Sequence, residues 1–288
     1  MQDMQDLIRR LNQTGRRLSK GHRRIADYIV QHYDKAVFMT ASSLGERVGV
    51  SESTVVRFAS ALGYEGYSQL QRALQELVRH RLTAVQRFEM TSDLDQKEIL
   101  QTVLKADMQN IRSTIEELDN HTFDDVVNRI VNARTLYVMG VRSAAPLASF
   151  LGYYLHFVFD NVHVASAGVI DVFEQISRIG SEDVLIGISF PRYSTRTLDA
   201  MKFAIGRGAQ VIGITDGPMS PLAEVSTECL TARTDMASFV DSLAAPLSLI
   251  NALIVAVGLR RREELAEHFS QLEGIWERNH TYLERERT

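Results

Sequence analysis

The spacing of apolar residues indicates a helical N-terminal part. Apolar residues there recur mostly three or four positions apart, which is the period of a helix with one buried face. They are Ile25, Ile29 and Val30; Leu44 and Val48; Val55, Phe58, Ala59 and Leu62; and Leu70, Leu74 and Leu77. Ser19, Thr40 and Ser51 precede three of the predicted helices as N-caps. Residues 1–82 are therefore predicted to form a compact all-α domain.

Residues 83–122 continue the helical pattern as a connector. Two helical stretches are predicted between 83 and about 132, because apolar residues keep the helical period and Pro and Gly are absent. The apolar positions include Ile99, Val103, Met108, Ile111 and Ile115. We expect this connector to pack on the second domain, and a partner subunit is a further candidate.

From Thr135 onward, short β-branched runs alternate with helical segments. The five runs TLYVMGV, VHVAS, DVLIGIS, AQVIGIT and TECLTA have the length of buried parallel strands. Helices are predicted over Ala144–Phe159, Ile170–Ile179, Thr195–Arg207, Pro221–Val225, Ser238–Leu259 and Glu263–Leu283. This alternation predicts a flavodoxin-like, doubly wound, five-stranded parallel sheet in residues 123–288. The chain is thus of the α/β class, with an all-α N-terminal domain.

Composition narrows the classes of protein that fit. Of 288 residues, 45% are hydrophobic and 24% charged, as in ordinary soluble globular proteins. No apolar stretch approaches the roughly 18 residues of a membrane span, and the charged N-terminus lacks the apolar core of a signal peptide. We therefore expect a cytoplasmic protein without a membrane partner. Cys229, the single cysteine, offers neither a disulfide nor metal-site spacing, and no cofactor is expected.

The net charge of −4 hides an asymmetry along the chain. Residues 1–82 hold 13 Lys and Arg against 8 Asp and Glu, whereas the remainder holds 19 against 28. A basic domain attached to an acidic body is typical of a DNA-binding head on a body that does not bind DNA. The acidic body disfavours a structural, DNA-organising protein.

The segment Thr40–Tyr64 has the length and pattern of a helix-turn-helix. Its first helix is predicted over Ala41–Val48, its turn at Gly49 and Val50, and its second helix over Ser51–Leu62. Leu44, Val48, Val50, Val55 and Phe58 are predicted to form its core. The side chains predicted to face DNA are Ser51, Glu52, Ser53, Thr54 and Arg57, with Arg16, Arg17, Lys20, Arg23, Arg24 and Arg47 available for phosphates. A helical hairpin with a solvated face and ordinary N-cap chemistry is the alternative interpretation.

The second helix and its continuation resemble the N-terminal domain of the RpiR family of bacterial regulators. The matching residues are Ser51, Ser53, Thr54, Val55, Arg57, Phe58, Leu62, Gly63, Tyr64, Gly66 and Tyr67. The resemblance implies binding of double-stranded DNA. In a dimer, two recognition helices on a two-fold axis predict a palindromic operator.

One loop of the C-terminal part begins at Gly140, where the first predicted strand ends. Gly140 permits a tight turn, and Arg142 and Ser143 follow at a predicted helix start, where free amides and the helix dipole favour an anion. A G-x-G-x-x-G fingerprint is absent, so no dinucleotide site is predicted. The loop after the fourth strand is expected to be structural, with Ser220 as a helix N-cap and Pro221 in the first turn.

The third predicted strand ends in the loop Ser189–Thr197. It carries Arg192, Tyr193 and Ser194 between a strand and a helix start, a combination that suits a phosphate or a carboxylate. The carboxyl ends of strands in an open sheet are also where ligands bind. Ordinary turn chemistry explains the same residues equally well, with Pro ending the strand and hydroxyls capping the helix.

The order of these loops resembles the sugar isomerase (SIS) domain, the usual C-terminal partner in the RpiR family, over Phe123–Leu259. The resemblance implies that Ser143 lines a pocket and that the second loop holds the phosphate of a sugar phosphate. The hydroxyl candidates are Ser189, Ser194 and Thr197. SIS domains carry S-x-S-G-x-T at this loop, whereas this chain has S-F-P-R-Y-S-T-R-T. The added Arg192 and Tyr193 offer a charged clamp and an aromatic wall, and leave a carboxylate as the alternative ligand.

A sugar-phosphate isomerase is the competing function. It needs a general base and a ring-opening acid, for which Glu174, His163 and then His156 are the candidates. A solvated carboxylate and a packed histidine are more common, and catalysis leaves the N-terminal domain unexplained. We therefore expect a regulator of carbohydrate metabolism without catalytic residues.

SIS-like domains assemble as dimers or tetramers, so a homodimer or homotetramer is expected. The predicted helix Ser238–Leu259 is a candidate subunit contact. Its apolar face, formed by Leu243, Leu247, Ile250 and Ile254, fits an intramolecular core equally well.

Overall fold

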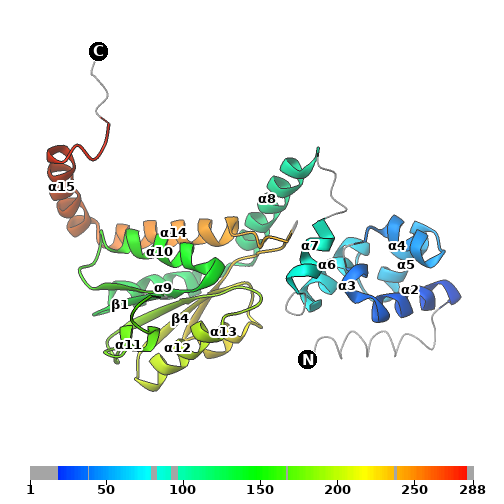
Figure 1. Ribbon diagram of the computed structural model, residues 1–288, viewed down its shortest axis with the longest axis horizontal. Helices are drawn as coiled ribbons and strands as arrows, with labels where there is room; N and C mark the ends of the chain where they lie inside the picture. Colours follow the sequence, from blue (N-terminus) through cyan, green and yellow to red (C-terminus); the bar gives the residue numbers. More distant parts are fainter. Residues whose placement is uncertain are drawn as a thin grey trace, which may run out of the picture. The chain divides into compact units, whose positions relative to one another are not determined.

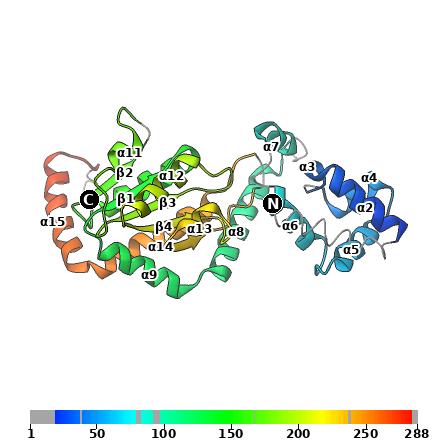
Figure 2. The ribbon, with the colours of Figure 1, turned by 90° about the horizontal axis from the view of Figure 1, so that it is seen from below.

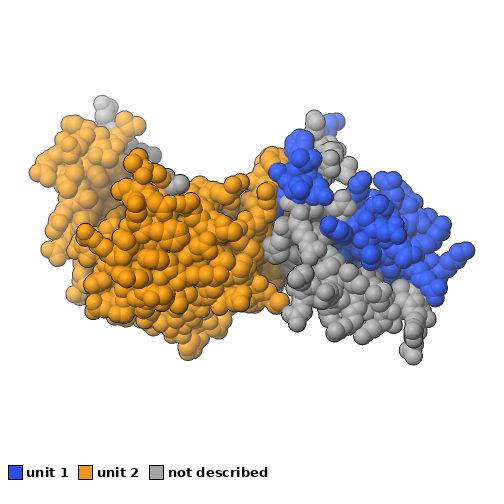
Figure 3. Space-filling model, turned by 60° about the horizontal axis from the view of Figure 1, so that its bottom comes forward, with its two compact units in different colours: residues 1–99 blue, residues 100–288 orange. Residues whose placement is uncertain are grey.

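The computed structural model describes residues 19–37, 39–78, 83–91, 97–166, 168–236 and 239–283. The chain forms two compact units, residues 1–99 and 100–288, which Figure 3 colours separately. The predicted connector over 83–122 lies on both sides of this division.

The first unit is helical throughout its described part (Figure 1). It contains α2 (Lys20–Gln31), α3 (Tyr33–Ala36), α4 (Ala41–Val48), α5 (Glu52–Ala61), α6 (Tyr67–Val78) and α7 (Ala84–Thr91). Ser19 and Thr40 accept backbone hydrogen bonds as the N-caps of α2 and α4, as predicted. Ile25, Leu44 and Phe58 are fully buried in its core, so the periodic apolar residues do form the inner faces of these helices.

The second unit contains the predicted parallel sheet. Its helices are α8 (Ile99–Glu117), α9 (Asn120–Val131), α10 (Ala145–Leu155), α11 (Val172–Gln175), α12 (Thr195–Gly206), α13 (Pro221–Val225), α14 (Ala244–Arg260) and α15 (Arg262–Arg278). Its strands are β1 (Leu136–Gly140), β2 (Val162–Ala165), β3 (Val184–Ile188), β4 (Gln210–Thr215) and β5 (Glu228–Thr231). All five are parallel, in the order β2-β1-β3-β4-β5, which is the flavodoxin-like order (Figure 2).

Helices cover both faces of this sheet (Figure 1). On one face, α9, α10 and α14 pack against alternate strand residues such as Val138 and Ile186. On the other face, α11, α12 and α13 pack against Met139, Leu185 and their neighbours. All residues of β1 and β3 are buried, which explains why these strands are continuous apolar runs.

Four predicted helices differ in extent from the observed ones. The helix predicted over Glu263–Leu283 ends at Arg278, as α15. The helix predicted over Ser238–Leu259 begins only at Ala244; Pro246 has no N–H to donate and fits only the first turn of a helix. The helix predicted over Ile170–Ile179 is reduced to α11, and the one predicted from Ala144 to Phe159 ends at Leu155. In α14, Leu249, Ile250 and Leu253 are buried in the core of the unit.

None of the described helices is, by itself, long and apolar enough to cross a membrane. The pair α14 and α15, bent by 99°, reaches the required length and composition only when taken together.

Candidate functional site

The turn between α4 and α5 is held by close packing. Gly49 adopts the left-handed conformation with φ of 69°, and its carbonyl accepts a hydrogen bond from Arg24 Nη1 at 3.4 Å. A Cβ atom on Gly45 would lie 2.8 Å from the backbone oxygen of Val50. This glycine therefore allows α4 to approach the start of α5, as the predicted helix-turn-helix requires.

The outward face of α5 carries the residues predicted to face DNA. Ser51 occupies the N-cap position, but its hydroxyl makes no capping bond and instead lies 3.0 Å from Ser53 Oγ and 2.8 Å from Thr54 Oγ1. Arg57 is exposed, and its Nε donates to the carbonyl of Ser53 at 3.2 Å. Glu52 is exposed as well. Among the described residues, none accepts a hydrogen bond from the terminal nitrogens of Arg57.

Basic residues lie around the start of α5. Gly21 of α2 faces Thr54, since a Cβ atom on it would lie 3.3 Å from Thr54 Cγ2. This contact brings the first turn of α2, with Lys20, to the N-terminal end of α5. The exposed basic side chains of the first unit include Lys20, Arg23, Arg24 and Arg47, whereas Arg16 and Arg17 lie outside the described residues.

The first ligand loop leaves the sheet at its topological switch point, where β1 and β3 are neighbours. Gly140 is paired with Ile188 there. A Cβ atom on Gly140 would lie 2.7 Å from the carbonyl oxygen of Ala144, so the chain can turn this tightly only at a glycine. The helix predicted from Ala144 begins at Ala145 as α10, and Ser143 lies exposed in a single 3-10 turn, Arg142–Ala144, that precedes it.

The second ligand loop follows β3 and is ordered by its own hydroxyls. Ser189 is buried, and its Oγ accepts from the amide of Ser194 at 3.0 Å. Ser194 is the N-cap of α12 and accepts from the amide of Thr197 at 3.3 Å. Thr197 is fully buried, and its Oγ1 has no hydrogen-bond partner among the described residues. The hydroxyls of Ser189 and Ser194 therefore stabilise the turn and cap the helix, whereas the hydroxyl of Thr197 takes no part in these hydrogen bonds.

The residues that distinguish this loop are held by neighbouring loops. Tyr193 Oη donates to Asp216 Oδ1, at the end of β4, at 2.8 Å. Arg196 forms an ion pair with Asp171. Arg192 itself is exposed. The contribution of Asp216 was missed from the sequence, where the loop after β4 appeared to be only a helix start.

Backbone strain gathers at this edge of the sheet. The described non-glycine residues with positive φ are Arg142 at 57°, Arg192 at 67° and His280 at 49°. Such a conformation costs a non-glycine residue roughly 1–3 kcal/mol and is typical of functional loops. Two arginines, one from each loop, are held in this way on either side of the switch point.

Two of the three isomerase candidates have structural partners. Glu174 forms a capping box with Asp171 at the start of α11, and accepts from the Asp171 amide at 3.2 Å. His163 stacks on Tyr137 with ring centroids 5.2 Å apart. His156 lies just after α10 and lines a cavity at the other edge of the sheet. Within the described ranges, no group of three or more His, Cys, Asp or Glu side chains could hold a metal ion.

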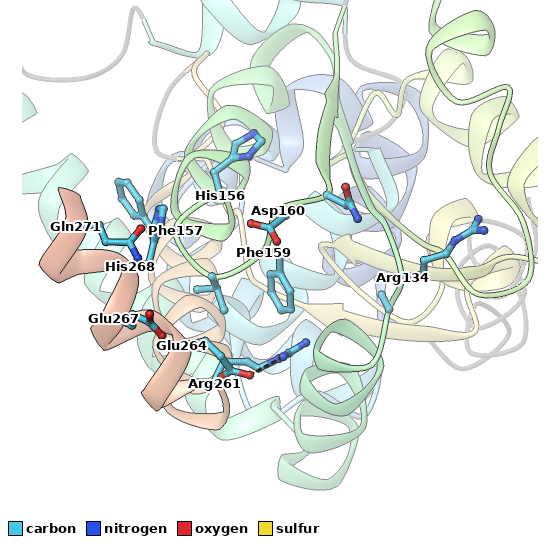
Figure 4. A pocket seen from close by; sticks show the side chains of 13 residues that line it. Arg134, His156, Phe157, Phe159, Asp160, Arg261, Glu264, Glu267, His268 and Gln271 are labelled. Atoms are coloured by element: carbon cyan, nitrogen blue, oxygen red, sulfur yellow. Dashed lines mark hydrogen bonds and ion pairs between the residues drawn. The ribbon is translucent and has the colours of Figure 1, made fainter. Parts of the chain in front are cut away.

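Two cavities lie at the amino ends of the strands, opposite the ligand loops. One, of about 380 Å³, lies between α15 and the end of α10 (Figure 4). The other, of about 680 Å³, shares Ala133, Arg134 and Arg261 with it. The arginines that line them have acidic partners: Arg261 Nη1 lies 2.7 Å from Glu264 Oε1, the dashed pair in Figure 4, and Arg134 and Arg129 pair with Asp183 and Glu228. These cavities therefore offer no unpaired cation comparable to Arg192.

Comparison with known proteins assigns both units to families. Residues 5–80 match the helix-turn-helix domain of the rpiR family, and residues 129–256 match the SIS domain. The HTH-type transcriptional regulator HexR of Pseudomonas aeruginosa is 24% identical over 274 residues, which cover 93% of this chain and 95% of that protein. An HTH-type transcriptional regulator of Haemophilus influenzae is 26% identical, covering 88% of this chain and 90% of that one.

Two solved structures share the fold. The sugar isomerase domain of an RpiR transcription factor from Sphaerobacter thermophilus, 23% identical, superposes with a TM-score of 0.59 over 61% of this chain and 98% of its own. The Vibrio vulnificus NanR protein, solved in complex with ManNAc-6P, is 22% identical, with a TM-score of 0.56 over 94% of this chain and 97% of its own.

Proposed function

Because the chain is an HTH-type transcriptional regulator of the RpiR family with a C-terminal SIS domain, we propose that it binds a palindromic DNA operator and senses a small anionic effector, best a sugar phosphate. Residues 1–82 are the DNA-binding domain, and residues 123–288 form the effector domain. The protein acts in the cytoplasm as a homodimer or homotetramer.

The proposal for DNA rests on the outward face of α5. Its first turn is lined with short hydroxyl side chains that allow close approach to a major groove, and Arg57 follows one turn later. An arginine fork matches the two acceptors of guanine, whereas the surrounding lysine and arginines suit phosphates. Ser51, Glu52, Ser53, Thr54 and Arg57 are the proposed base-facing residues, and Arg47 and Lys20 the proposed phosphate contacts.

The operator is to be found by selecting sites from a random pool of double-stranded DNA with the full-length protein. We expect an inverted repeat. Arg57→Ala should weaken binding to that sequence by about 1–3 kcal/mol, while Arg262→Ala, which removes the same charge from α15, should leave it unchanged. Equal affinity of wild type and Arg57→Ala for the selected sequence would remove Arg57 from the recognition surface.

The proposal for the effector rests on polar groups at the carboxyl ends of β1 and β3 that the fold itself does not use. Two exposed arginines flank the switch point, and the buried Thr197 hydroxyl has no protein partner in the described part. The proposed ligand residues are Gly140, Arg142, Ser143, Ser189, Arg192, Tyr193, Ser194 and Thr197. The related NanR protein binds ManNAc-6P, which supports a sugar phosphate over other anions.

A thermal-shift screen tests this effector. ManNAc-6P, other hexose and pentose phosphates, the matching free sugars and sugar acids are compared, since a ligand of the folded state raises the melting temperature. We expect stabilisation by a phosphate ester, lost in Arg192→Ala and kept in the matched control Arg207→Ala. If only unphosphorylated acids stabilise the protein, the effector is a carboxylate and the sugar-phosphate assignment is wrong.

We propose further that the SIS domain binds its ligand without converting it. The capping box of Glu174 and the ring stacking of His163 support this, because both candidate groups have structural partners. Incubation of the stabilising ligand with the protein, followed by NMR, should show no isomerisation. Turnover lost in Glu174→Gln would instead support the isomerase alternative. Effector binding is expected to change operator affinity by about 1–3 kcal/mol, or roughly five- to 150-fold.

A further inference from the structure

Helix α8, at the start of the second unit, has polar residues buried and apolar residues exposed. At 100° per residue, its side chains fall on three faces. The charged face, with Lys105, Gln109 and Arg112, is exposed to solvent. Of the two other faces, the polar one is buried and the apolar one is exposed. This is the reverse of an ordinary surface helix, whose apolar stripe points inward.

The polar face of α8 is attached to the segment that follows β5. Asn110 is buried and exchanges two hydrogen bonds with the backbone of Asp235, at 2.9 and 3.1 Å. The Thr114 hydroxyl accepts from the amide of Arg233 at 2.9 Å, and the side chain of Arg233 pairs with Glu117 at 2.7 Å. These bonds hold α8 in a fixed rotation about its own axis.

That rotation turns the apolar face outward. Leu100 is 71% exposed, Leu104 54%, Met108 70% and Ile115 72%, values normally found for surface polar residues. Ile111 lies on the same stripe and is partly covered by the core below it. A contiguous apolar stripe on a rigidly held helix is the signature of a contact with another surface.

We infer that this stripe is a subunit contact, in which α8 packs against α8 of a second copy of the chain. The apolar residues of the stripe follow one another at spacings of four, three and four, which is the a/d pattern of two helices packed with knobs in holes. They are Leu104, Met108, Ile111 and Ile115, and Leu118 continues the pattern just after α8 ends. A partner helix needs the same period, and a second α8 has it. A two-fold axis then places the same residues on both sides of the contact.

The size of the stripe agrees with this occupant. Four side chains exposed to this extent present on the order of 400 Å² per copy, about half of what one partner contributes to a standard interface. This contact rests on the homo-oligomer of the proposed function, but not on which DNA or effector the protein binds. A monomeric wild type would overturn both, whereas an oligomeric wild type whose mass is unchanged in Met108→Glu would overturn only the α8 contact.

The mass of the full-length protein in solution tests the contact. Light scattering after gel filtration should give a dimer or larger for the wild type and half that mass for Met108→Glu, with an unchanged circular dichroism spectrum. Ile205→Glu, which places the same charge on an exposed aliphatic position of α12, should keep the wild-type mass. A monomeric wild type, an unchanged mass of Met108→Glu, or an equal loss in Ile205→Glu overturns the inference.

Disulfide trapping provides a second readout that does not rely on disrupting the contact. Burial raises the pKa of the Cys229 thiol to about 12, so the wild-type chain serves as an unreactive background. Met108→Cys should form a covalent dimer on oxidation, because its sulfur lies at the contact. Gln109→Cys, the next residue but on the charged face, should not. Cross-linking of both or of neither variant contradicts the α8 contact.

Discussion

Asp183 connects two strands of the sheet at the edge opposite the ligand loops, and Asp183→Asn isolates the importance of its charge. The residue precedes β3 and is completely buried. Its carboxylate accepts two hydrogen bonds from Arg134, which lies just before β1: one from Nε at 2.9 Å and one from Nη2 at 2.7 Å. It accepts a third from the backbone amide of Gly180 at 2.8 Å. Asparagine has nearly the same shape, so the substitution changes charge and hydrogen bonding but not packing.

The expected loss follows from these bonds. An asparagine keeps one acceptor oxygen and turns an NH₂ group toward donors that need an acceptor. A hydrogen bond to a charged group contributes roughly 1.5–3 kcal/mol, and a buried donor left unpaired costs a similar amount. The guanidinium of Arg134 is half exposed and can turn to water, whereas the Gly180 amide belongs to the backbone and cannot turn away from the new side chain. We therefore expect Asp183→Asn to lower the free energy of unfolding of the second unit by about 2–3 kcal/mol.

The pH dependence of this loss identifies the charge as its cause. Burial raises the pKa of Asp183, but the hydrogen bonds and the charge of Arg134, with the Gly180 amide, outweigh it and hold the pKa below its ordinary value. The ionised form thus stabilises the fold above the unfolded-state pKa of about 3.9, and this contribution disappears as the pH falls through the folded-state pKa. The difference between wild type and Asp183→Asn should shrink below about pH 4.

Urea denaturation at a series of pH values measures this difference. Glu182→Gln is the matched control, because Glu182 is the neighbouring carboxylate, 3.5 Å from Arg134 and 73% exposed. It should change stability by less than about 0.5 kcal/mol. A difference between wild type and Asp183→Asn that stays constant from neutral to acid pH would refute the reasoning. The stabilisation by effector should be retained in Asp183→Asn, since the ligand loops lie at the other edge.

Two further substitutions probe glycine-dependent geometry. Gly45→Ala should destabilise the first unit by about 1–3 kcal/mol and weaken operator binding, because the added Cβ meets the Val50 carbonyl. Urea denaturation measures the stability, and Ser42→Ala, on the exposed side of α4, should change neither property. Arg142→Gly relieves a positive φ and should raise the free energy of unfolding by up to about 1 kcal/mol while abolishing the thermal shift with effector. Loss of stability in Arg142→Gly would show that the side chain, and not the strain, dominates.

The elements of the fold were predictable because their signals are local. All five apolar runs contain the observed strands, and the helix-turn-helix falls at the predicted α4 and α5. The parallel direction of the strands followed from their alternation with helices, since parallel neighbours need a crossover connection. The limits of α14 were less accurate, although Pro246 in the sequence marks where that helix can begin.

The two predicted ligand loops lie at the ends of β1 and β3, as residue type and position indicated, and their binding of a ligand stays a prediction. Gly140 and the hydroxyls of the second loop follow directly from their places at strand ends. Asp216 was missed, because its role depends on Tyr193 reaching across from the loop after β3 to the end of β4, and that distance along the chain carries no pattern. The left-handed conformations of Arg142 and Arg192 have no sequence signature either, since neither position is a glycine.

Helix α8 explains most clearly why the remainder was not predictable. The helical period was recognised, and the usual rule then assigns its apolar residues to the core and its polar residues to solvent. The rule fails because Asn110 and Thr114 find their partners in residues 233–235, more than a hundred positions away. Once these bonds fix the rotation of the helix, Leu104, Met108 and Ile115 have no remaining place inside their own unit. An apolar period therefore predicts that a face will be covered, but it does not distinguish the chain's own core from a second copy of the chain.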